Sequence, residues 1–219
     1  MDRALEAFEQ GERARIAGDD EAAIDYYREA LTLCEDSSQL EAWRVQHMLG
    51  VSLTSAEQYS LAQTYFAEAR LHAPNSAMGA ICRNHARCLL LQGNAFSALG
   101  KINESLEYIP IEHLSERGAS NGFLARIQIA RGHTYLALQY FGLADSLLQR
   151  GDNRYYELYN LLHFIEALID AGESTYAISM FDRVQSLIKE YGNKKHQDTF
   201  DHLMNLATME YAIEQVATE

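Results

Sequence analysis

A pattern of small and large residues recurs along this chain, and it constrains the fold more than any other feature. Between residues 49 and 74, a Leu-Gly pair is followed by an Ala, an aromatic pair, a second Ala and a Pro. Gly50 and Ala62 would let two helix backbones approach closely, and Phe66 would fill the space beyond them. Pro74 would end the second helix because it cannot extend it. The segment therefore predicts two helices packed as a hairpin.

The pattern occurs five times, at residues 4–35, 43–74, 79–110, 125–156 and 158–189. The first three copies keep most of it and the last two keep part. Aligned on their small first-helix positions, the copies are 39, 36, 46 and 33 residues apart. The residues aligned in this way are Gly11, Gly50, Ala86, Gly132 and Ile165. The long third interval is assigned to a surface loop at 111–122, which is rich in Ser, Gly and Asn.

This order of residues resembles the tetratricopeptide repeat (TPR), in which a Trp, a Leu-Gly pair and a Tyr precede an Ala, a Phe, another Ala and a closing Pro. The resemblance implies an all-α fold, a right-handed superhelix of about five helix hairpins with a C-terminal helix at about 194–216. It implies about eleven helices in a single solenoid over residues 1–219. With two prolines in 219 residues, little interrupts the helices. A generic helical bundle and other α-solenoids built from helix pairs are the structural alternatives.

The same alignment predicts which small residues lie at close helix contacts. They are Gly50, Ala62, Gly93, Ala98, Gly132 and Ala144.

Net charge and cysteine content exclude several classes of protein. The formal charge of −13 disfavours nucleic acid and anionic lipid as partners. No apolar run approaches the roughly 18 residues that span a bilayer, and the first residues do not resemble a signal peptide, so we expect a cytoplasmic protein. Cys34, Cys82 and Cys88 are odd in number and form no C-x-x-C pair, which predicts buried, reduced thiols.

The sequence offers no motif for catalysis. It has no G-x-S-x-G elbow, no glycine-rich phosphate loop and no H-E-x-x-H. His163 with Glu166, and Asp198 with His202, each have helical spacing, but two ligands do not make a zinc site. We therefore expect no metal, no cofactor and no enzymatic activity.

The resemblance to TPR proteins implies a concave surface, lined by the first helices, that holds a segment of a partner. The inward positions of the second to fourth repeats carry cations and neutral polar residues: Arg44, His47, Arg83, Asn84, Arg87, Arg126 and His133. The end repeats offer Glu9, Glu12, Glu166 and Asp170 instead. Such a surface predicts an acidic segment or a terminal carboxylate as ligand, because Arg binds carboxylates bidentately. The alternative is that these arginines are ordinary solvated residues or intrahelical partners.

Some TPR proteins hold a terminal carboxylate with Lys and Asn at fixed positions of the groove. Phe8 and Glu12 stand where the first repeat would need those two residues. The chain therefore departs from that clamp.

The last helix has two apolar stripes. Phe200, Leu203, Met204, Ala207 and Tyr211 form one, which can cover the fifth repeat. The second consists of Leu206, Met209, Ile213 and Val216. This second stripe predicts homodimerisation or partner docking; the alternatives are a frayed tail or a wrong register.

These observations favour a protein–protein interaction module or scaffold that binds a partner segment in its groove. The alternative is a peptide-sensing regulatory protein resembling TPR-containing peptide receptors. An enzyme is the third and weakest hypothesis.

Overall fold

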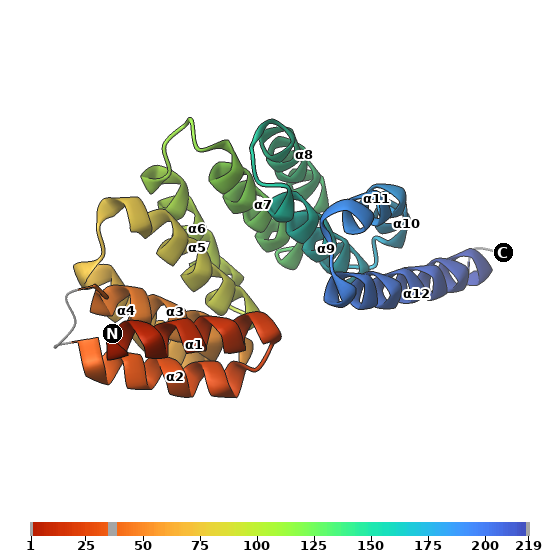
Figure 1. Cartoon of the computed structure of the whole chain (residues 1–219). Coiled ribbons are helices and arrows are strands. Elements are labelled where there is room, and N and C mark those ends of the chain that lie inside the picture. Colours follow the sequence, from red (N-terminus) through yellow and green to blue (C-terminus); the bar gives the residue numbers. More distant parts are fainter. Residues whose placement is uncertain (1, 35–38, 218–219) are drawn as a thin grey trace. The chain divides into compact units, whose positions relative to one another are not determined.

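The fold is all-α, as the sequence predicts. The computed structural model describes residues 2–34 and 39–217, with side chains to residue 213, and it shows twelve helices and no strand among them (Figure 1). The chain divides into two compact units, Met1–Ile109 and Pro110–Glu219, and each is described by itself. A single solenoid over the whole chain stays a prediction.

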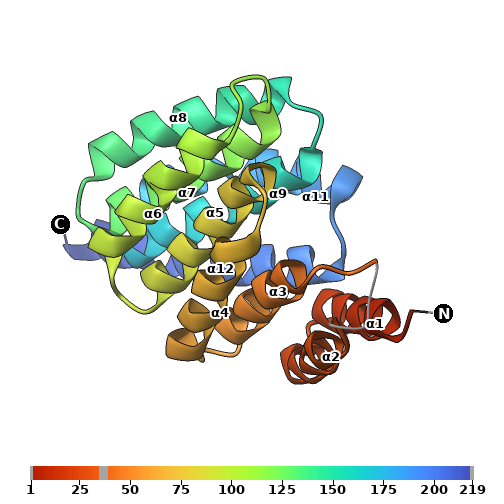
Figure 2. The ribbon, with the colours of Figure 1, turned by 90° about the vertical axis from the view of Figure 1, so that its left-hand side faces the viewer.

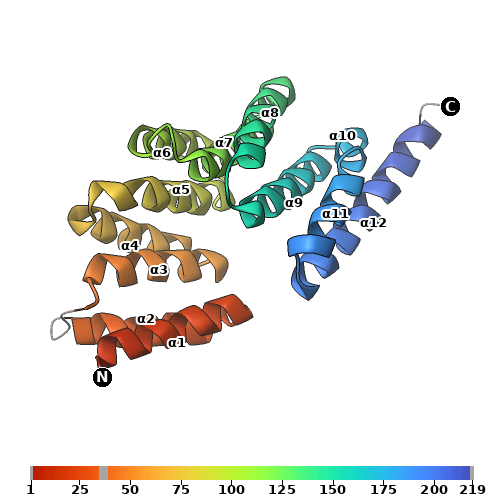
Figure 3. The ribbon, with the colours of Figure 1, turned by 45° about the horizontal axis from the view of Figure 1, so that its top comes forward.

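The first unit contains three helix hairpins, in which each helix packs on the next along the chain (Figure 3). Its helices are α1 (Arg3–Ala17), α2 (Asp20–Leu33), α3 (Ala42–Ser55), α4 (Tyr59–His72), α5 (Asn75–Leu91) and α6 (Ala95–Tyr108). Three of these helices are preceded by a capping residue whose side chain accepts hydrogen bonds from backbone N–H groups of the first turn. The capping residues are Asp2 for α1, Asp19 for α2 and Asn94 for α6. These caps satisfy backbone N–H groups that have no partner within the helix.

The second unit is arranged around one long central helix. Its helices are α7 (Leu114–Ala130), α8 (Thr134–Arg150), α9 (Arg154–Asp170), α10 (Ser174–Ile178), α11 (Phe181–Tyr191) and α12 (Lys194–Ala217). The helix α9 contacts all five others, and α7 and α8 lie side by side (Figures 1 and 2). The stacked rings of Phe141 and Phe164, 4.1 Å apart, join α8 to α9 in the core.

The five hairpins share one type of turn between their two helices. A left-handed residue stands in each turn: Gly18, Glu57, Gly93, Gly132 and Gly172, with φ between 60° and 88°. The next residue donates its N–H to a carbonyl five residues earlier, at 2.8 to 3.0 Å, as in Asp19 to Ala14 and His133 to Gln128. This is the Schellman arrangement, which ends a helix at a left-handed residue.

A second feature, shared by the first four hairpins, is a small first-helix residue opposite a large second-helix residue; in the fifth hairpin Ile165 takes the first-helix position. A Cβ atom on Gly11 would lie 2.6 Å from the ring of Tyr27, and one on Gly50 would lie 2.7 Å from that of Phe66. Sixteen residues separate the two members of each pair, and the same spacing joins Ala86 to Ile102, Ala125 to Phe141 and Ile165 to Phe181. An alanine without solvent exposure recurs four residues before each large residue: Ala23, Ala62, Ala98, Ala137 and Ala177.

This register corrects the predicted fourth repeat. Ala125, not Gly132, occupies the small first-helix position, so successive repeats are 39, 36, 39 and 40 residues apart. The predicted loop at 111–122 was wrong, because α7 begins at Leu114. Its Ser, Gly and Asn residues are buried at helix contacts: a Cβ on Gly118 would lie 2.6 Å from Leu148, and one on Gly122 would overlap Asn160. The small residues that indicated a loop therefore allow close packing.

Two of the six predicted close-contact positions were also wrong. Gly93 and Gly132 have open space where a Cβ would stand, and their role is the left-handed turn. Gly50, Ala62, Ala98 and Ala144 are buried as predicted. The helix count differs by one as well, because the second helix of the fifth hairpin is interrupted at Ser179 and Met180 between α10 and α11.

We expect Gly50→Ala to destabilise the protein by about 1–3 kcal/mol, because the added methyl would overlap the Phe66 ring. Gly100→Ala is the matched control: Gly100 lies in α6 with open space around it, so the substitution should add roughly 0.5–1 kcal/mol of stability. Urea denaturation followed by circular dichroism measures both. Equal effects of the two substitutions would contradict the close contact.

For Gly132→Ala we expect a loss of about 1–2 kcal/mol, caused by the left-handed φ of 75° and not by overpacking. Gly132→Asn should cost less, because Asn tolerates this conformation. If Asn proved as costly as Ala in the same denaturation assay, the turn would not be the cause.

Candidate functional site

The first unit contains a hollow of about 330 Å³ between its first helices. Three helices contribute to it: α1, α3 and α5. Its lining residues are Phe8, Glu12, Trp43, Arg44, His47, Met48, Ala77 and Ala80. The hollow therefore combines an apolar wall with a few polar groups, as ligand sites commonly do.

Arg44 places a positive charge at the edge of this hollow. Its side chain is exposed, and its guanidinium carbon lies 5.5 Å from the centre of the Phe8 ring. An arginine in this position is held by the ring face while its N–H groups stay available to solvent. The Phe8 ring thus supports the guanidinium group of Arg44 at the edge of the hollow.

Glu12 is the acidic residue in the lining, and its carboxylate is engaged within the protein. Arg15 donates a hydrogen bond to it at 2.9 Å, and the Tyr27 hydroxyl donates another. Burial by itself would raise the pKa of Glu12, but the hydrogen bonds from Arg15 and Tyr27 outweigh burial and lower it. The negative charge of Glu12 is therefore largely compensated.

His47 is a neutral hydrogen-bonding group of the same site. The amide nitrogen of Asn84 lies 2.9 Å from Nε2 of His47, and because an amide nitrogen only donates, the imidazole nitrogen accepts. Burial, followed by the nearby positive charge of Arg83, lowers the pKa of His47 to about 4. His47 and Asn84 bind each other, so each has part of its hydrogen-bonding capacity already used.

The structure brings together four of the seven predicted groove residues: Arg44, His47, Arg83 and Asn84. Arg83 and Arg87 lie one turn apart on α5, and both are half-buried. Arg44 lines the hollow, and Arg83 lies close enough to lower the pKa of His47, so two arginines place positive charge at the site. Arg87 is the fifth predicted groove residue of the first unit. The sequence had no signal for the engagement of Glu12, because Tyr27 approaches it from another helix.

The other two predicted groove residues, Arg126 and His133, belong to the second unit. Arg126 is buried on α7, with its guanidinium carbon 4.9 Å from the centre of the Phe123 ring. His133 lies exposed in the turn before α8, where its Nδ1 is 3.1 Å from Oε1 of Gln128. Its assignment to an inward first-helix position was wrong, and the cause is the seven-residue shift in the predicted register.

The predicted acidic residues of the end repeats have local partners. Glu9 lies 3.9 Å from Arg13, and Glu166 lies 2.8 Å from His163. For Asp170, burial raises the pKa, and the neighbouring charges of Glu166 and Glu210 raise it further, while Arg126 opposes them. Negative charge thus gathers at the end of α9.

The second unit also holds charged pairs that the sequence analysis did not find. Arg183 on α11 pairs with Asp145 on α8 and with the buried Glu157 on α9, which also receives a hydrogen bond from Arg154 at 2.9 Å. These contacts cross three helices and satisfy the buried carboxylate of Glu157. Their role is structural.

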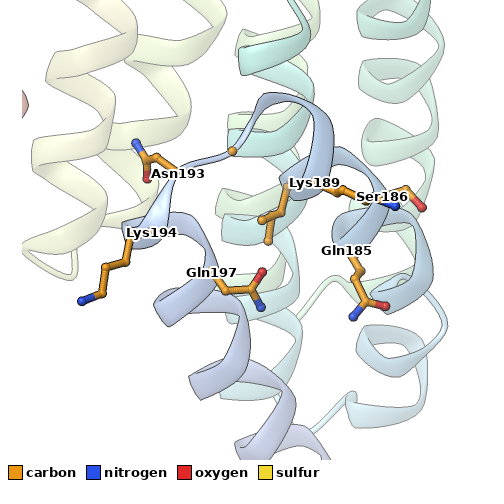
Figure 4. A pocket seen from close by; sticks show the side chains of 8 residues that line it. Gln185, Ser186, Lys189, Asn193, Lys194 and Gln197 are labelled. Atoms are coloured by element: carbon orange, nitrogen blue, oxygen red, sulfur yellow. The ribbon is translucent and has the colours of Figure 1, made fainter.

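A larger hollow, of about 640 Å³, lies between α11 and the start of α12. Figure 4 shows Gln185 and Gln197 on facing helices, with Lys194 pointing away from them. Its lining residues are Gln185, Ser186, Ile188, Lys189, Gly192, Asn193, Lys194 and Gln197. The lining has three neutral amides and two lysines, and the hydroxyl of Ser186 donates to the backbone carbonyl of Asp182, so no nucleophile is paired with a base there.

The His–carboxylate pairs and the cysteines noted in the sequence have ordinary surroundings in the described part of the chain. Its residues include no cluster of three or more His, Cys, Asp or Glu side chains that could hold a metal ion. Asp198 and His202 are exposed on α12. All three cysteines are buried, as predicted, and burial raises the pKa of each thiol, to about 11 for Cys82. Among the described helices, none is long and apolar enough to cross a bilayer.

No protein-family profile and no curated protein sequence matches this chain. Among solved structures, it is similar to a Podospora anserina kinesin light chain-like protein with nearly identical TPR-like repeats, with 16% identity and a TM-score of 0.61. That match covers 85% of this chain and 95% of the other.

Two further structures are similar at lower TM-scores. A TPR-repeat protein from Bacteroides fragilis has 13% identity and a TM-score of 0.41, covering 96% of this chain and 89% of the other. The TPR2AB domain of yeast Sti1, in its pHSP90 complex, has 13% identity and a TM-score of 0.42, covering 94% and 98%. The first match and the repeated hairpins confirm the predicted fold.

We expect the protein to lose stability as the pH falls from about 6.5 toward 4. Burial lowers the pKa of both His47 and His85 to about 4, whereas an unfolded histidine titrates near 6.5. Between these values the unfolded chain binds more protons than the folded chain, so the free energy of unfolding should fall by on the order of 1 kcal/mol per histidine and pH unit. Urea denaturation at pH 7.5, 6.5, 5.5 and 4.8 measures it.

The variant His47→Gln/His85→Gln should flatten this dependence, whatever its stability at pH 7.5. The measured quantity is the slope of the free energy of unfolding against pH, so a loss of stability that is equal at every pH would leave it unchanged. A wild-type free energy of unfolding that is constant from pH 7.5 to 4.8 would contradict the assignment.

Proposed function

We propose, from the tetratricopeptide-repeat fold and the charges of the first unit, that this protein is an interaction module that binds an acidic segment of a partner protein. The segment would lie in the hollow formed by α1, α3 and α5. The observation that carries the proposal is the charge imbalance of this site. Arg44 and Arg83 contribute positive charge, while the carboxylate of Glu12 is already bound by Arg15 and Tyr27.

A net positive site on a chain of charge −13 favours an anionic ligand at that place. Guanidinium groups hold carboxylates with paired, charge-assisted hydrogen bonds, which are stronger than neutral ones. The wall formed by Phe8, Trp43 and Met48 could take an apolar side chain beside the acidic one. The ligand we propose is therefore a peptide segment with Asp or Glu next to an apolar residue.

Nothing in the described residues favours the peptide-sensing alternative over this proposal. A cytoplasmic location fits it, since three cysteines that form no disulfide keep their thiols in a reducing compartment.

The test uses an array of twelve-residue peptides that carry Asp or Glu beside Leu or Phe, each with a partner in which Asn or Gln replaces the acid. We expect the wild-type protein to retain acidic peptides over their amide partners. Arg44→Ala/Arg83→Ala should weaken the retained peptides by about 10-fold or more, because each charge-assisted bond contributes about 1.5–3 kcal/mol. Fluorescence anisotropy with a selected, labelled peptide gives the dissociation constants.

Arg13→Ala/Arg28→Ala is the matched control, because it removes the same charge from exposed positions with local ion pairs. This variant should bind like the wild type. Affinity of the wild type should also fall as NaCl rises from 50 to 500 mM. Equal binding by both double variants, or no preference for acidic peptides, would refute the proposal.

A further inference from the structure

The C-terminal half of α12 leaves a line of apolar side chains in solvent. Phe200, Leu203 and Ala207 are at most 4% exposed, and the helix contacts α9, α10 and α11. On another side, Leu206, Met209 and Ile213 follow at intervals of three and four residues and are 38%, 64% and 66% exposed. Figures 1 and 3 show this half of α12 continuing past α10 and α11. The fourth predicted member, Val216, has a side chain outside the described residues.

This exposed line is almost without charge. From Met204 to Ile213 the one charged residue is Glu210, and it accepts a hydrogen bond from the Ser174 hydroxyl at 2.7 Å. Such a strip has little to attract a charged partner and little to repel an identical strip. Since the whole chain has a charge of −13, a place where two copies can meet without repulsion requires a neutral surface of this kind.

A second copy of the chain offers the same neutral, apolar strip. The two strips can cover each other, because a two-fold interface uses the same surface on both partners.

We propose that two copies of this chain associate through α12. The two helices would pack antiparallel about a two-fold axis near Met209, with Leu206 of one copy facing Ile213 of the other. Three apolar residues per copy bury less surface than a standard protein–protein interface does. The dimer is therefore weak and depends on concentration.

Sedimentation equilibrium of the full chain from 5 to 500 µM tests the association. We expect the wild type to shift from monomer to dimer over this range, and Met209→Asp/Ile213→Asp to weaken the dimer by about 10-fold or more, because a charge would be buried in an apolar contact. Leu71→Asp is the control: Leu71 is 73% exposed on α4, and its replacement should leave the dimer intact. Circular dichroism should show all three proteins folded.

A cysteine cross-link tests the geometry. The three native cysteines are buried, so a new thiol at Met209→Cys should be the reactive one, and two of them should form a disulfide between copies if Met209 lies near the axis. Leu71→Cys should not cross-link under the same conditions.

A wild type that is monomeric at 500 µM, or a dimer that both aspartate variants retain, would overturn the proposal. This result is independent of the peptide site, because an apolar contact does not weaken when NaCl rises from 50 to 500 mM, whereas the arginine site does.

Discussion

The structure depends on one pairing, present in the first four hairpins, of a small residue of the first helix with a large residue sixteen positions later in the second. At Gly11 and Gly50 the rings of Tyr27 and Phe66 occupy the volume that a Cβ would need. This contact fixes the distance between the two helices, and the buried alanine four residues before the ring keeps it short. The left-handed turn then sets the direction of the second helix. Three positions, the small residue, the large residue and the turn residue, therefore determine which residues of the two helices face each other.

The same contact forms part of the proposed binding site. Tyr27 fills the space above Gly11, and its hydroxyl reaches Glu12, the next residue of α1. Burial, followed by this hydrogen bond, raises the pKa of Tyr27, so the phenol remains a donor. A packing residue therefore compensates the acidic charge of the hollow. The arginines on α3 and α5 then make the net charge of the hollow positive. Packing and electrostatics are coupled here through adjacent residues.

Much of the fold could be predicted from the sequence, because small residues at fixed spacing have few other uses. The error at the fourth repeat shows the limit. Glycine serves two purposes in this chain, close contact at Gly50 and left-handed φ at Gly132, and one sequence does not distinguish them. The distance from each first-helix residue to its turn, seven residues in all five hairpins, carried the missing information. Of the site, the types of residue were predictable, but the bonds between helices, such as Asn84 to His47, were not.

The fifth hairpin and α12 show why the end of this chain is the least regular part. Ile165 replaces the small first-helix residue, and the second helix is interrupted between α10 and α11. Ile165 is fully buried, and its branched side chain fills space that glycine or alanine leaves open at this position in the other hairpins. The charged pair of Arg183 with Glu157 joins the two helices of this hairpin, as the hydrogen bond from the Tyr27 hydroxyl to Glu12 joins those of the first. The helix α12 covers this hairpin with Phe200, whose ring meets that of Phe181 edge to face at 5.5 Å. Phe181 stands at the position that Tyr27, Phe66, Ile102 and Phe141 occupy in the other hairpins, and here it also holds α12 against the fifth hairpin.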